Sequence, residues 1–267
     1  MTYIALTIAG SDSGGGAGVQ ADLKTMSALG VYGASVLTAI TAQNTRAVTA
    51  VEEVSPGMVA AQIAAVLDDL PVGAIKIGML SSAAVIGAVA DALQGFKGPI
   101  VLDPVMVAKS GDALLQPEAV AALTARLLPR AALLTPNLPE AARLLGAAEA
   151  ATEDEMLAQG QALLALGPCA VLMKGGHGEG PDCLDFLIAS DSVPVAFRAP
   201  RLRTKNTHGT GCTLSSAIAS GLAKGLDIVQ SVAEAHAYLQ GAIRAADTLR
   251  IGSGHGPVHH FHATWPA

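Results

Sequence analysis

Short apolar runs alternate with longer helix-like stretches along this chain. The runs predicted as strands are 4–9, 35–40, 74–77, 100–102, 131–134 and 170–173, and two more, 183–188 and 195–198, predict a β-hairpin around Ser190-Asp191. The stretches predicted as helices are 19–29, 56–70, 81–93 (capped by Ser81 or Ser82), 117–128, a pair divided near Ala150, 210–222 and 227–249. Strands buried on both faces are near-continuous apolar runs, as these are. The alternation therefore predicts an α/β fold with a central, mainly parallel sheet flanked by helices on both faces.

The length and composition fit one large domain spanning residues 1–267. Apolar residues make up 51% of the chain and aromatic residues only 3%, so the core must be built from Ala, Val, Leu and Ile. The N-terminus is predicted as a strand and its loop rather than a signal peptide, and no apolar run of about 20 residues could span a bilayer. The Gly- and His-rich segment from Gly252 onward is predicted to be a surface extension.

Charge and cysteine content exclude several classes of protein. The formal net charge of -6 and the pI near 5.6 argue against a nucleic-acid partner. The three cysteines, Cys169, Cys183 and Cys212, show no CxxC spacing, which argues against a disulfide framework or a structural zinc site. We expect a cytoplasmic protein with reduced thiols, and we expect Cys169 and Cys183 to be small buried residues.

Polar residues gather where the predicted strands end. Gly10-Ser11-Asp12 follows the first strand, and Asp103, Asn137 and Lys174 each follow a later one. Ligands of open α/β sheets bind beyond the carboxyl ends of the strands. Each residue alone could be an ordinary loop residue, but together they predict a site at this edge.

The strongest local signal is Gly209-Thr210-Gly211-Cys212 at the start of a predicted helix. A glycine-rich helix start can bind an anion through unpaired N–H groups and the positive end of the helix dipole. The alternative is an ordinary glycine-rich cap. The dipole is also expected to lower the pKa of Cys212.

A second glycine-rich segment, residues 10–18, follows the first strand. It matches neither the dinucleotide fingerprint, which disfavours a Rossmann dehydrogenase, nor a P-loop, because it lacks GK[ST]. We predict a mobile substrate loop. Asp22, in the helix that follows, is predicted to point back to the same site, or else to interact favourably with the helix dipole.

Asn137-Leu138-Pro139-Glu140 opens a helix and could be a capping arrangement. The functional alternative is that Glu140 orients water around Mg²⁺ while Asp103 helps to hold the ion. Lys109 could reach the transferring phosphate, and Lys174 could contact nucleotide phosphates. The histidines of the tail, His255, His259, His260 and His262, have no carboxylate or cysteine at ligand spacing and are taken as surface residues.

Several stretches resemble the hydroxymethylpyrimidine/phosphomethylpyrimidine kinases of thiamine biosynthesis, within the ribokinase-like superfamily. They are AGSDSGGGAGVQADLKT, TAITAQNT, KIGML, LDPVMVAKSG, LTPNLPEA, VLMKGGH, NTHGTGCTLSSAIAS and IGSGHGPVHHF, which run in family order from residue 8 to residue 261. The resemblance implies a ribokinase-like fold, Mg-ATP as the phosphoryl donor, two successive phosphorylations of an aminopyrimidine, and a homodimer.

The resemblance also implies roles for individual residues. Gln43 would hydrogen-bond the aminopyrimidine, since a carboxamide offers both a donor and an acceptor. The other substrate-side candidates are Met79, Asp22, Gly10 and Val105. The anion hole would be Gly209, Thr210, Gly211 and Cys212, with Lys109 over the phosphate. Lys174, Asn137 and Thr207 would line the nucleotide side, with Asp103 and Glu140 at the metal.

Many ribokinase-like relatives carry Asp where this chain has Cys212, so a thiolate would replace the usual base. Two alternatives remain open at this point. One is a pyridoxal or pyridoxine kinase of the same branch, and the other is a binding protein for a pyrimidine or nucleotide without catalytic activity.

Overall fold

The computed structural model describes residues 2–106, 117–176, 180–190 and 192–265. Its main sheet contains β1 (Ile4–Ala9), β2 (Tyr32–Leu37), β5 (Ala74–Ile77), β6 (Ile100–Leu102), β7 (Leu133–Leu134), β8 (Ala170–Lys174), β9 (Asp182–Ala189) and β10 (Val195–Pro200). The strand order is β10-β9-β8-β7-β6-β5-β1-β2. All pairs from β8 to β2 are parallel, while β9 and β10 form the predicted antiparallel hairpin. The mainly parallel sheet is therefore confirmed.

Helices cover both faces of this sheet. One face carries α1 (Gly18–Ala28), α7 (Thr210–Ala223) and α8 (Ile228–Arg244), and the other carries α2 (Pro56–Asp69), α3 (Ala83–Ala92), α4 (Pro117–Arg126), α5 (Leu138–Leu145) and α6 (Glu153–Leu164). The side chains of a strand alternate between the two layers: Val101 packs with α7 and α8, whereas Ile100 and Leu102 pack with the opposite layer. Both faces are thus buried, as the continuous apolar runs predict. None of the helices within the described ranges is long and apolar enough to cross a bilayer.

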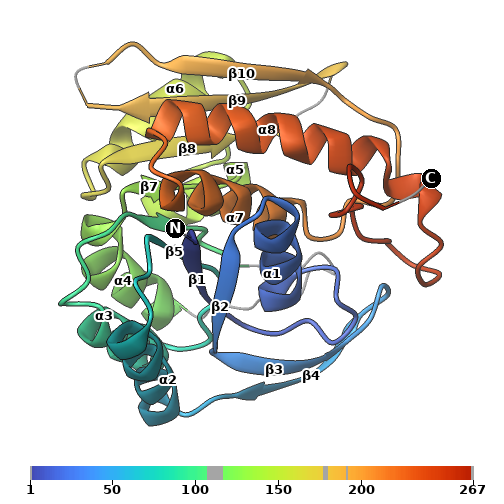
Figure 1. Ribbon diagram of the computed structural model, residues 1–267. Helices are drawn as coiled ribbons and strands as arrows, with labels where there is room; N and C mark the ends of the chain where they lie inside the picture. The colour runs from blue at the N-terminus through green and yellow to red at the C-terminus, as the bar shows by residue number, and fades with distance from the viewer. Residues whose placement is uncertain (1, 107–116, 177–179, 191, 266–267) are drawn as a thin grey trace.

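The predicted strand 35–40 is divided in two, because the chain leaves the main sheet at Thr38: residues 35–37 end β2, and Ala39 and Ile40 belong to a second sheet. The Thr38 N–H donates to Ala9 and its hydroxyl donates to the Met79 carbonyl (2.8 Å). Beyond it, β3 (Ala39–Gln43) pairs with β4 (Val48–Glu53) in a separate antiparallel ribbon, which lies below the main sheet in Figure 1. Nearly every residue of β4 is exposed, so the strand has no apolar pattern that could have predicted it.

Element boundaries differ from prediction only at some ends. The predicted strand 131–134 is reduced to β7, because the short 3-10 helix Leu128–Arg130 runs up to Ala131. α3 starts after Ser82, whose hydroxyl accepts from the Val85 N–H. α8 ends at Arg244 and is followed by a 3-10 turn, Ala246–Thr248.

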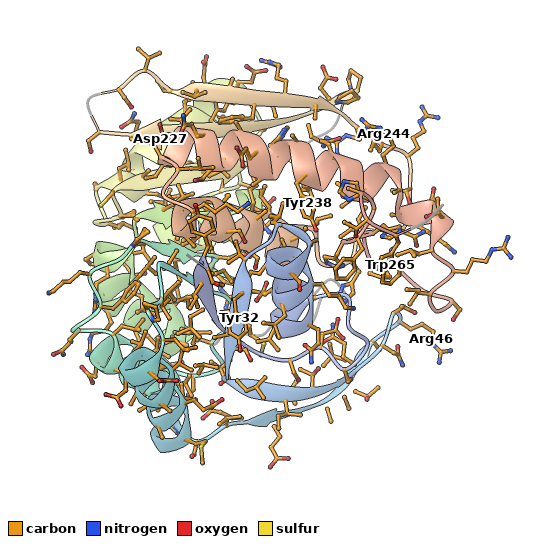
Figure 2. The ribbon with its side chains drawn as sticks, in the orientation of Figure 1. Tyr32, Arg46, Asp227, Tyr238, Arg244 and Trp265 are labelled. Carbon is orange, nitrogen blue, oxygen red and sulfur yellow. The ribbon has the colours of Figure 1, made fainter. Side chains whose placement is uncertain are left out.

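The tail after Gly252 is packed against the protein, which corrects the predicted surface extension. His208 pairs with Pro257, and the His255 N–H donates to the Thr45 carbonyl. His259 and His260 are buried, and the Tyr238 hydroxyl, labelled in Figure 2, donates to the His260 carbonyl (2.6 Å). The sequence showed only that this segment is rich in Gly and His, whereas its contacts come from distant parts of the chain.

The two cysteines expected in the core are not buried there. Cys169 is exposed and Cys183 is partly exposed. Cys169 lies one residue before β8, and Cys183 is the second residue of β9. Each cysteine lies at or near the end of its strand rather than in its middle, so being next to an apolar run did not make either side chain buried.

Candidate active site

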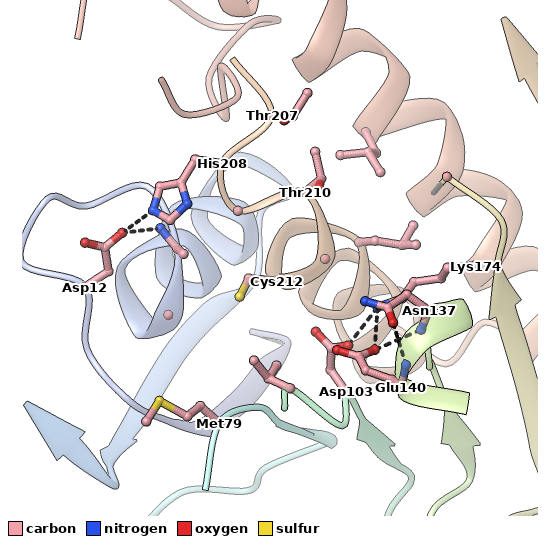
Figure 3. A pocket seen from close by; sticks show the side chains of 18 of the residues that line it. Asp12, Met79, Asp103, Asn137, Glu140, Lys174, Thr207, His208, Thr210 and Cys212 are labelled. Carbon is pink, nitrogen blue, oxygen red and sulfur yellow. Dashed lines mark hydrogen bonds and ion pairs between the residues drawn. The ribbon is translucent and has the colours of Figure 1, made fainter. Parts of the chain in front are cut away.

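A cavity of about 710 Å³ opens at the carboxyl ends of the parallel strands. The predicted residues that line it are Gly10, Gln43, Met79, Asp103, Val105, Asn137, Glu140, Lys174, Thr207, Gly209, Thr210, Gly211 and Cys212. Figure 3 shows Asp103, Glu140 and Lys174 grouped at one side, His208 and Asp12 at the other, and Cys212 between them. Lys109 lies in residues 107–116, outside the described residues.

Asp103 and Glu140 share one cation. Lys174 Nζ lies 2.9 Å from Asp103 Oδ1 and 3.9 Å from Glu140 Oε2. The Thr135 and Ser215 hydroxyls also donate to Asp103, each at 3.2 Å. Burial raises the pKa of Asp103, but the charges of Lys174 and Lys76 lower it by more, so the pKa is lowered overall. Burial, reinforced by Asp103, raises the pKa of Glu140 to about 7 in spite of Lys174.

The start of α5 is a capping box. Asn137 Oδ1 accepts from the Glu140 N–H and Glu140 Oε2 accepts from the Asn137 N–H, both at 2.8 Å. The structural interpretation of these two residues is therefore confirmed. The same residues also line the cavity, so the capping bonds fix the direction in which the Glu140 carboxylate faces it.

The loop before α7 brings backbone close to backbone. Gly209 is the N-cap with φ +81°, a left-handed conformation that favours glycine. A Cβ at Gly209 would lie 1.9 Å from the Gly16 carbonyl oxygen, so no side chain fits. The first intrahelical N–H of α7 is that of Thr213, donating to the Gly209 carbonyl (2.8 Å). Of the N–H groups before it, that of Thr210 donates to the Thr207 carbonyl (3.4 Å). Those of Gly211 and Cys212 precede the first intrahelical bond and can meet an anion, as predicted for a helix start of this kind.

The pKa of Cys212 is raised to about 11, which corrects the expectation of a lowered value. Burial is the main cause, and the carboxylates of Asp22 and Asp103 add to it. Lys76 and the Gly18 N–H act in the opposite direction but do not prevail. The sequence showed the helix start but neither the burial nor the two acidic neighbours.

Asp22 is not among the residues that line the cavity, and its place on the substrate side stays a prediction. Its carboxylate is completely buried and pairs with Lys76, at 2.8 Å and 3.0 Å. The Thr7 and Ser216 hydroxyls donate to the same carboxylate, at 2.6 Å and 2.5 Å. With all these partners, Asp22 has a structural role in joining β1, β5, α1 and α7.

The glycine-rich loop that we expected to be mobile is held by Asp12. The Asp12 carboxylate accepts from the N–H groups of Gly14 (2.8 Å), Gly16 (3.1 Å) and Ala17 (2.8 Å). It also lies 2.7 Å from His208 Nε2, as Figure 3 shows. One carboxylate thus gives the loop a fixed shape.

The comparisons with known proteins agree with this geometry. A sequence profile of the family described as phosphomethylpyrimidine kinase matches residues 12–259. A protein of Rhizobium meliloti (strain 1021), named hydroxymethylpyrimidine/phosphomethylpyrimidine kinase, is 60% identical over 265 residues, covering 99% of both chains. This chain belongs to the phosphomethylpyrimidine kinase family.

Two solved structures extend the likeness to the fold. The phosphomethylpyrimidine kinase of Clostridium difficile 630 is 45% identical, with a TM-score of 0.80 over 91% of this chain and 100% of that one. The pyridoxal kinase of Bacillus subtilis, solved as an ADP complex, is 34% identical, with a TM-score of 0.89 over 97% and 98% of the two chains. The predicted ribokinase-like kinase fold is confirmed.

For a kinase, the two carboxylates at Lys174 are the groups that could hold a metal. Among the residues that the structure describes, no cluster of three or more His, Cys, Asp or Glu side chains could bind a metal by itself. Mg²⁺ commonly takes only one or two carboxylates together with water and phosphate oxygens. The hard oxygen donors of Asp103 and Glu140 fit that mode, whereas they would not fit a zinc site.

Sequence reasoning missed several side chains that line the kinase cavity, among them Lys76, His208 and Asp185. Asp185 accepts from the Gly175 N–H (2.9 Å) and so orders the turn after Lys174. Lys76 could have been noticed, because a lysine inside the apolar strand AIKI must find a partner. His208 stands within NTHGTGCT, but nothing local indicates that its partner is Asp12, 196 positions earlier.

Proposed function

We propose that this kinase transfers the γ-phosphoryl group of Mg-ATP to the hydroxymethyl group of 4-amino-5-hydroxymethyl-2-methylpyrimidine, and then phosphorylates the resulting monophosphate to the diphosphate, in thiamine biosynthesis. One observation carries the proposal. A single cavity holds the Gln43 carboxamide beside His208, and Figure 3 shows His208 on one side, the carboxylates and Lys174 on the other, and Cys212 at the start of α7 between them. The names of the relatives indicate the same reaction.

The pyrimidine would bind at the side of Gln43. A carboxamide can donate to a ring nitrogen and accept from the neighbouring amino group. Met79 offers a flat apolar contact for the ring, and a Cβ at Gly10 would lie 3.1 Å from its sulfur, so the glycine leaves room for the Met79 side chain. Val105 supplies a further apolar wall of the same cavity.

The nucleotide would bind at the opposite side, with Lys174, Asn137 and Thr207 along its phosphates. Asp103 and Glu140 would hold Mg²⁺, which supplies neutralisation of the phosphate charge when bound. Lys174 pairs with these carboxylates. When Mg-ATP binds, Lys174 would give up its place at the carboxylates to Mg²⁺ and would pair with the phosphates instead. Lys109 is proposed as a further phosphate contact.

The start of α7 would receive the transferring phosphoryl group. Gly209 and Gly211 would present backbone N–H groups there, Thr210 would join them by exchanging its 3.4 Å bond to the Thr207 carbonyl, and Cys212 stands in the first turn. A hydroxymethyl group must lose its proton on transfer, and the thiolate of Cys212 is the proposed acceptor. Because the pKa of Cys212 is about 11 in the free protein, this role requires that bound Mg-ATP and substrate lower that pKa. A phosphate monoester needs no base, since its second pKa is about 6. Cys212→Ala should therefore slow the first phosphorylation more than the second, and equal losses in both would count against the role as base.

The test is ADP release by the purified protein with Mg-ATP and, in parallel, the hydroxymethylpyrimidine, its monophosphate and pyridoxal. Turnover of both pyrimidines with little of pyridoxal is expected. Asp103→Asn is the matched control for contaminating kinases, because it removes a proposed metal ligand with little change in volume. Silence of the wild-type protein with all three substrates would refute the proposal.

Pyridoxal kinase is the second candidate, because a solved pyridoxal kinase shares the fold at 34% identity. Pyridoxal is also a flat heteroaromatic ring with a hydroxymethyl arm. Turnover of pyridoxal alone in the same assay would select this activity. Binding of ligand and ATP without ADP release would instead indicate a binding protein without catalytic activity.

We also propose that residues 1–267 act as one kinase domain in a cytoplasmic homodimer. The lining of the cavity runs from Ala9 to Ile243, which supports one functional unit. Light scattering coupled to size-exclusion chromatography tests the dimer directly. A monomer at micromolar concentration would contradict it.

A further inference from the structure

The Asp12–His208 pair connects two loops that are far apart in the sequence. His208 Nε2 lies 2.7 Å from Asp12 Oδ2, and only 9% of His208 and 1% of Asp12 is exposed. Burial raises the pKa of Asp12, but the hydrogen bond and charge of His208 and the loop N–H groups outweigh it, so the pKa is lowered. The carboxylate is therefore the stable form in this contact.

The two loops touch with no room for side chains between them. The His208 ring lies over Gly16, where an added Cβ would be 2.4 Å from His208 Cδ2. The next residue, Gly209, faces the Gly16 carbonyl oxygen. Any shift of the ring would thus move the start of α7 relative to the glycine-rich loop.

On the substrate side, the same loop holds Gln43. The Ser13 hydroxyl donates to the Gln43 carbonyl, and the Gln43 N–H donates to Ser13 Oγ, both at 2.8 Å. Gln43 Nε2 lies 3.5 Å from His208 Nε2. The shape of the loop, and with it the place of Gln43, depends on the three N–H bonds that Asp12 accepts.

On the reaction side, His208 is fixed by its backbone. Its N–H donates to the Gly256 carbonyl (3.0 Å), and its carbonyl accepts from the Val258 N–H (3.4 Å). Because Gly209 directly follows His208, the position of the His208 backbone determines the position of the N–H groups from Gly209 to Cys212.

We propose that the Asp12–His208 pair is a positioning element of the phosphoryl transfer. It holds Gln43 and the start of α7 at a fixed separation, so that a pyrimidine bound at Gln43 presents its hydroxymethyl arm to the N–H groups of that turn. The inference rests on the proposed pyrimidine kinase activity. Neither side chain needs to touch the reacting atoms, since each acts through the loop that carries it.

The test is a double-mutant cycle with Asp12→Ala, His208→Ala and the double variant, measuring kcat and KM separately for the hydroxymethylpyrimidine and for ATP. Each single variant should raise the KM for the pyrimidine about tenfold, the order expected for a charge-assisted hydrogen bond, while the KM for ATP changes less than about twofold. The double variant should be no worse than the worse single variant, because the two side chains act as one unit. His208→Gln should restore much of the loss, since an amide N–H can still donate to Asp12.

His255→Ala is the matched control, because this exposed histidine lies in the same tail and its ring hydrogen-bonds to the Lys205 carbonyl rather than to either loop. Its KM values should equal those of the wild type. If His208→Ala does not fold, Asp12→Asn and His208→Gln replace it in the test. The KM for the pyrimidine should rise in Asp12→Asn and stay close to normal in His208→Gln. Additive effects, equal changes in both KM values, or a lower melting temperature with unchanged kinetics would overturn the inference. A wild-type protein that phosphorylates no pyrimidine would instead refute the proposed function.

Discussion

Replacing Lys76 with methionine removes one charge from a pair that has no contact with solvent. Both side chains of the Lys76–Asp22 pair are 0% exposed, and Lys76 Nζ contacts both carboxylate oxygens of Asp22. Methionine has a similar length and volume, so the substitution leaves little cavity. The dominant effect is an Asp22 carboxylate left in the core with the Thr7 and Ser216 hydroxyls as its remaining hydrogen-bond partners among the described residues.

Breaking a buried ion pair by removing one partner costs about 3–5 kcal/mol. Stabilities of natural domains are about 5–15 kcal/mol, so this is a large part of the total. For a chain of this size the loss corresponds to a fall in melting temperature of roughly 10 °C. We therefore expect Lys76→Met to fold only marginally at 37 °C.

Urea unfolding at pH 7, followed by circular dichroism, measures the loss. Lys97→Met is the control, because Lys97 is exposed and its replacement should change the free energy of unfolding by less than about 0.5 kcal/mol. The double variant Lys76→Met/Asp22→Leu should recover at least half of the loss, because it buries no unpaired charge. A loss below about 1 kcal/mol for Lys76→Met would refute the reasoning, since it would mean that Asp22 does not need a buried cation.

Three further predictions concern the cavity. Gly209→Ala should lower kcat/KM about a hundredfold or more, because its methyl group would displace the N–H groups at the start of α7. Gly87→Ala is the control and should have no such effect, because a Cβ at Gly87 meets nothing within 4 Å. Equal rates in both variants would contradict this prediction. The pKa of Asp12 is lowered by folding, so the ionised carboxylate stabilises the fold at pH values above its unfolded pKa of about 3.9. This stabilisation is lost as the pH falls through the folded pKa, so the free energies of unfolding of the wild type and Asp12→Asn should converge below about pH 4. A constant difference down to about pH 2 would argue against it. Because the pKa of Cys212 is about 11, iodoacetamide at pH 7 should modify the exposed Cys169 first. The rate of modification of Cys212, followed by peptide mapping, should still be rising at about pH 10. A plateau below about pH 9 would show that the thiolate of Cys212 forms more readily.

The sequence predicts the main sheet well because its strands are buried on both faces. Runs such as Ile4–Ala9 and Ala74–Ile77 are apolar except for one residue each, Thr7 and Lys76, so their length and their flanking polar residues mark both ends. The ribbon of β3 and β4 carries no such signal. Exposure of β4 on both faces removes the alternation on which strand prediction depends.

The site was predictable as far as it depends on strand ends and on one helix start. Asp103, Asn137 and Lys174 meet in the cavity because parallel strands end at the same edge of the sheet. Properties that depend on depth or on distant partners were not predictable. The pKa of Cys212 and the burial of Asp22 are of this kind, since both are set by side chains from other elements.

The pairing of the tail with early parts of the chain has a consequence for synthesis on the ribosome. Gly254 hydrogen-bonds to Thr45 across 209 positions, and Val258 and Gly256 hold the backbone of His208. At translation rates of about 5–20 residues per second, the hairpin that carries Gln43 waits roughly 10–40 s for these partners. During that time the turn at Thr45 and the backbone of His208 lack their partners in the tail. A nascent chain stalled before residue 254 would carry nearly all of the catalytic side chains without the contacts that align them.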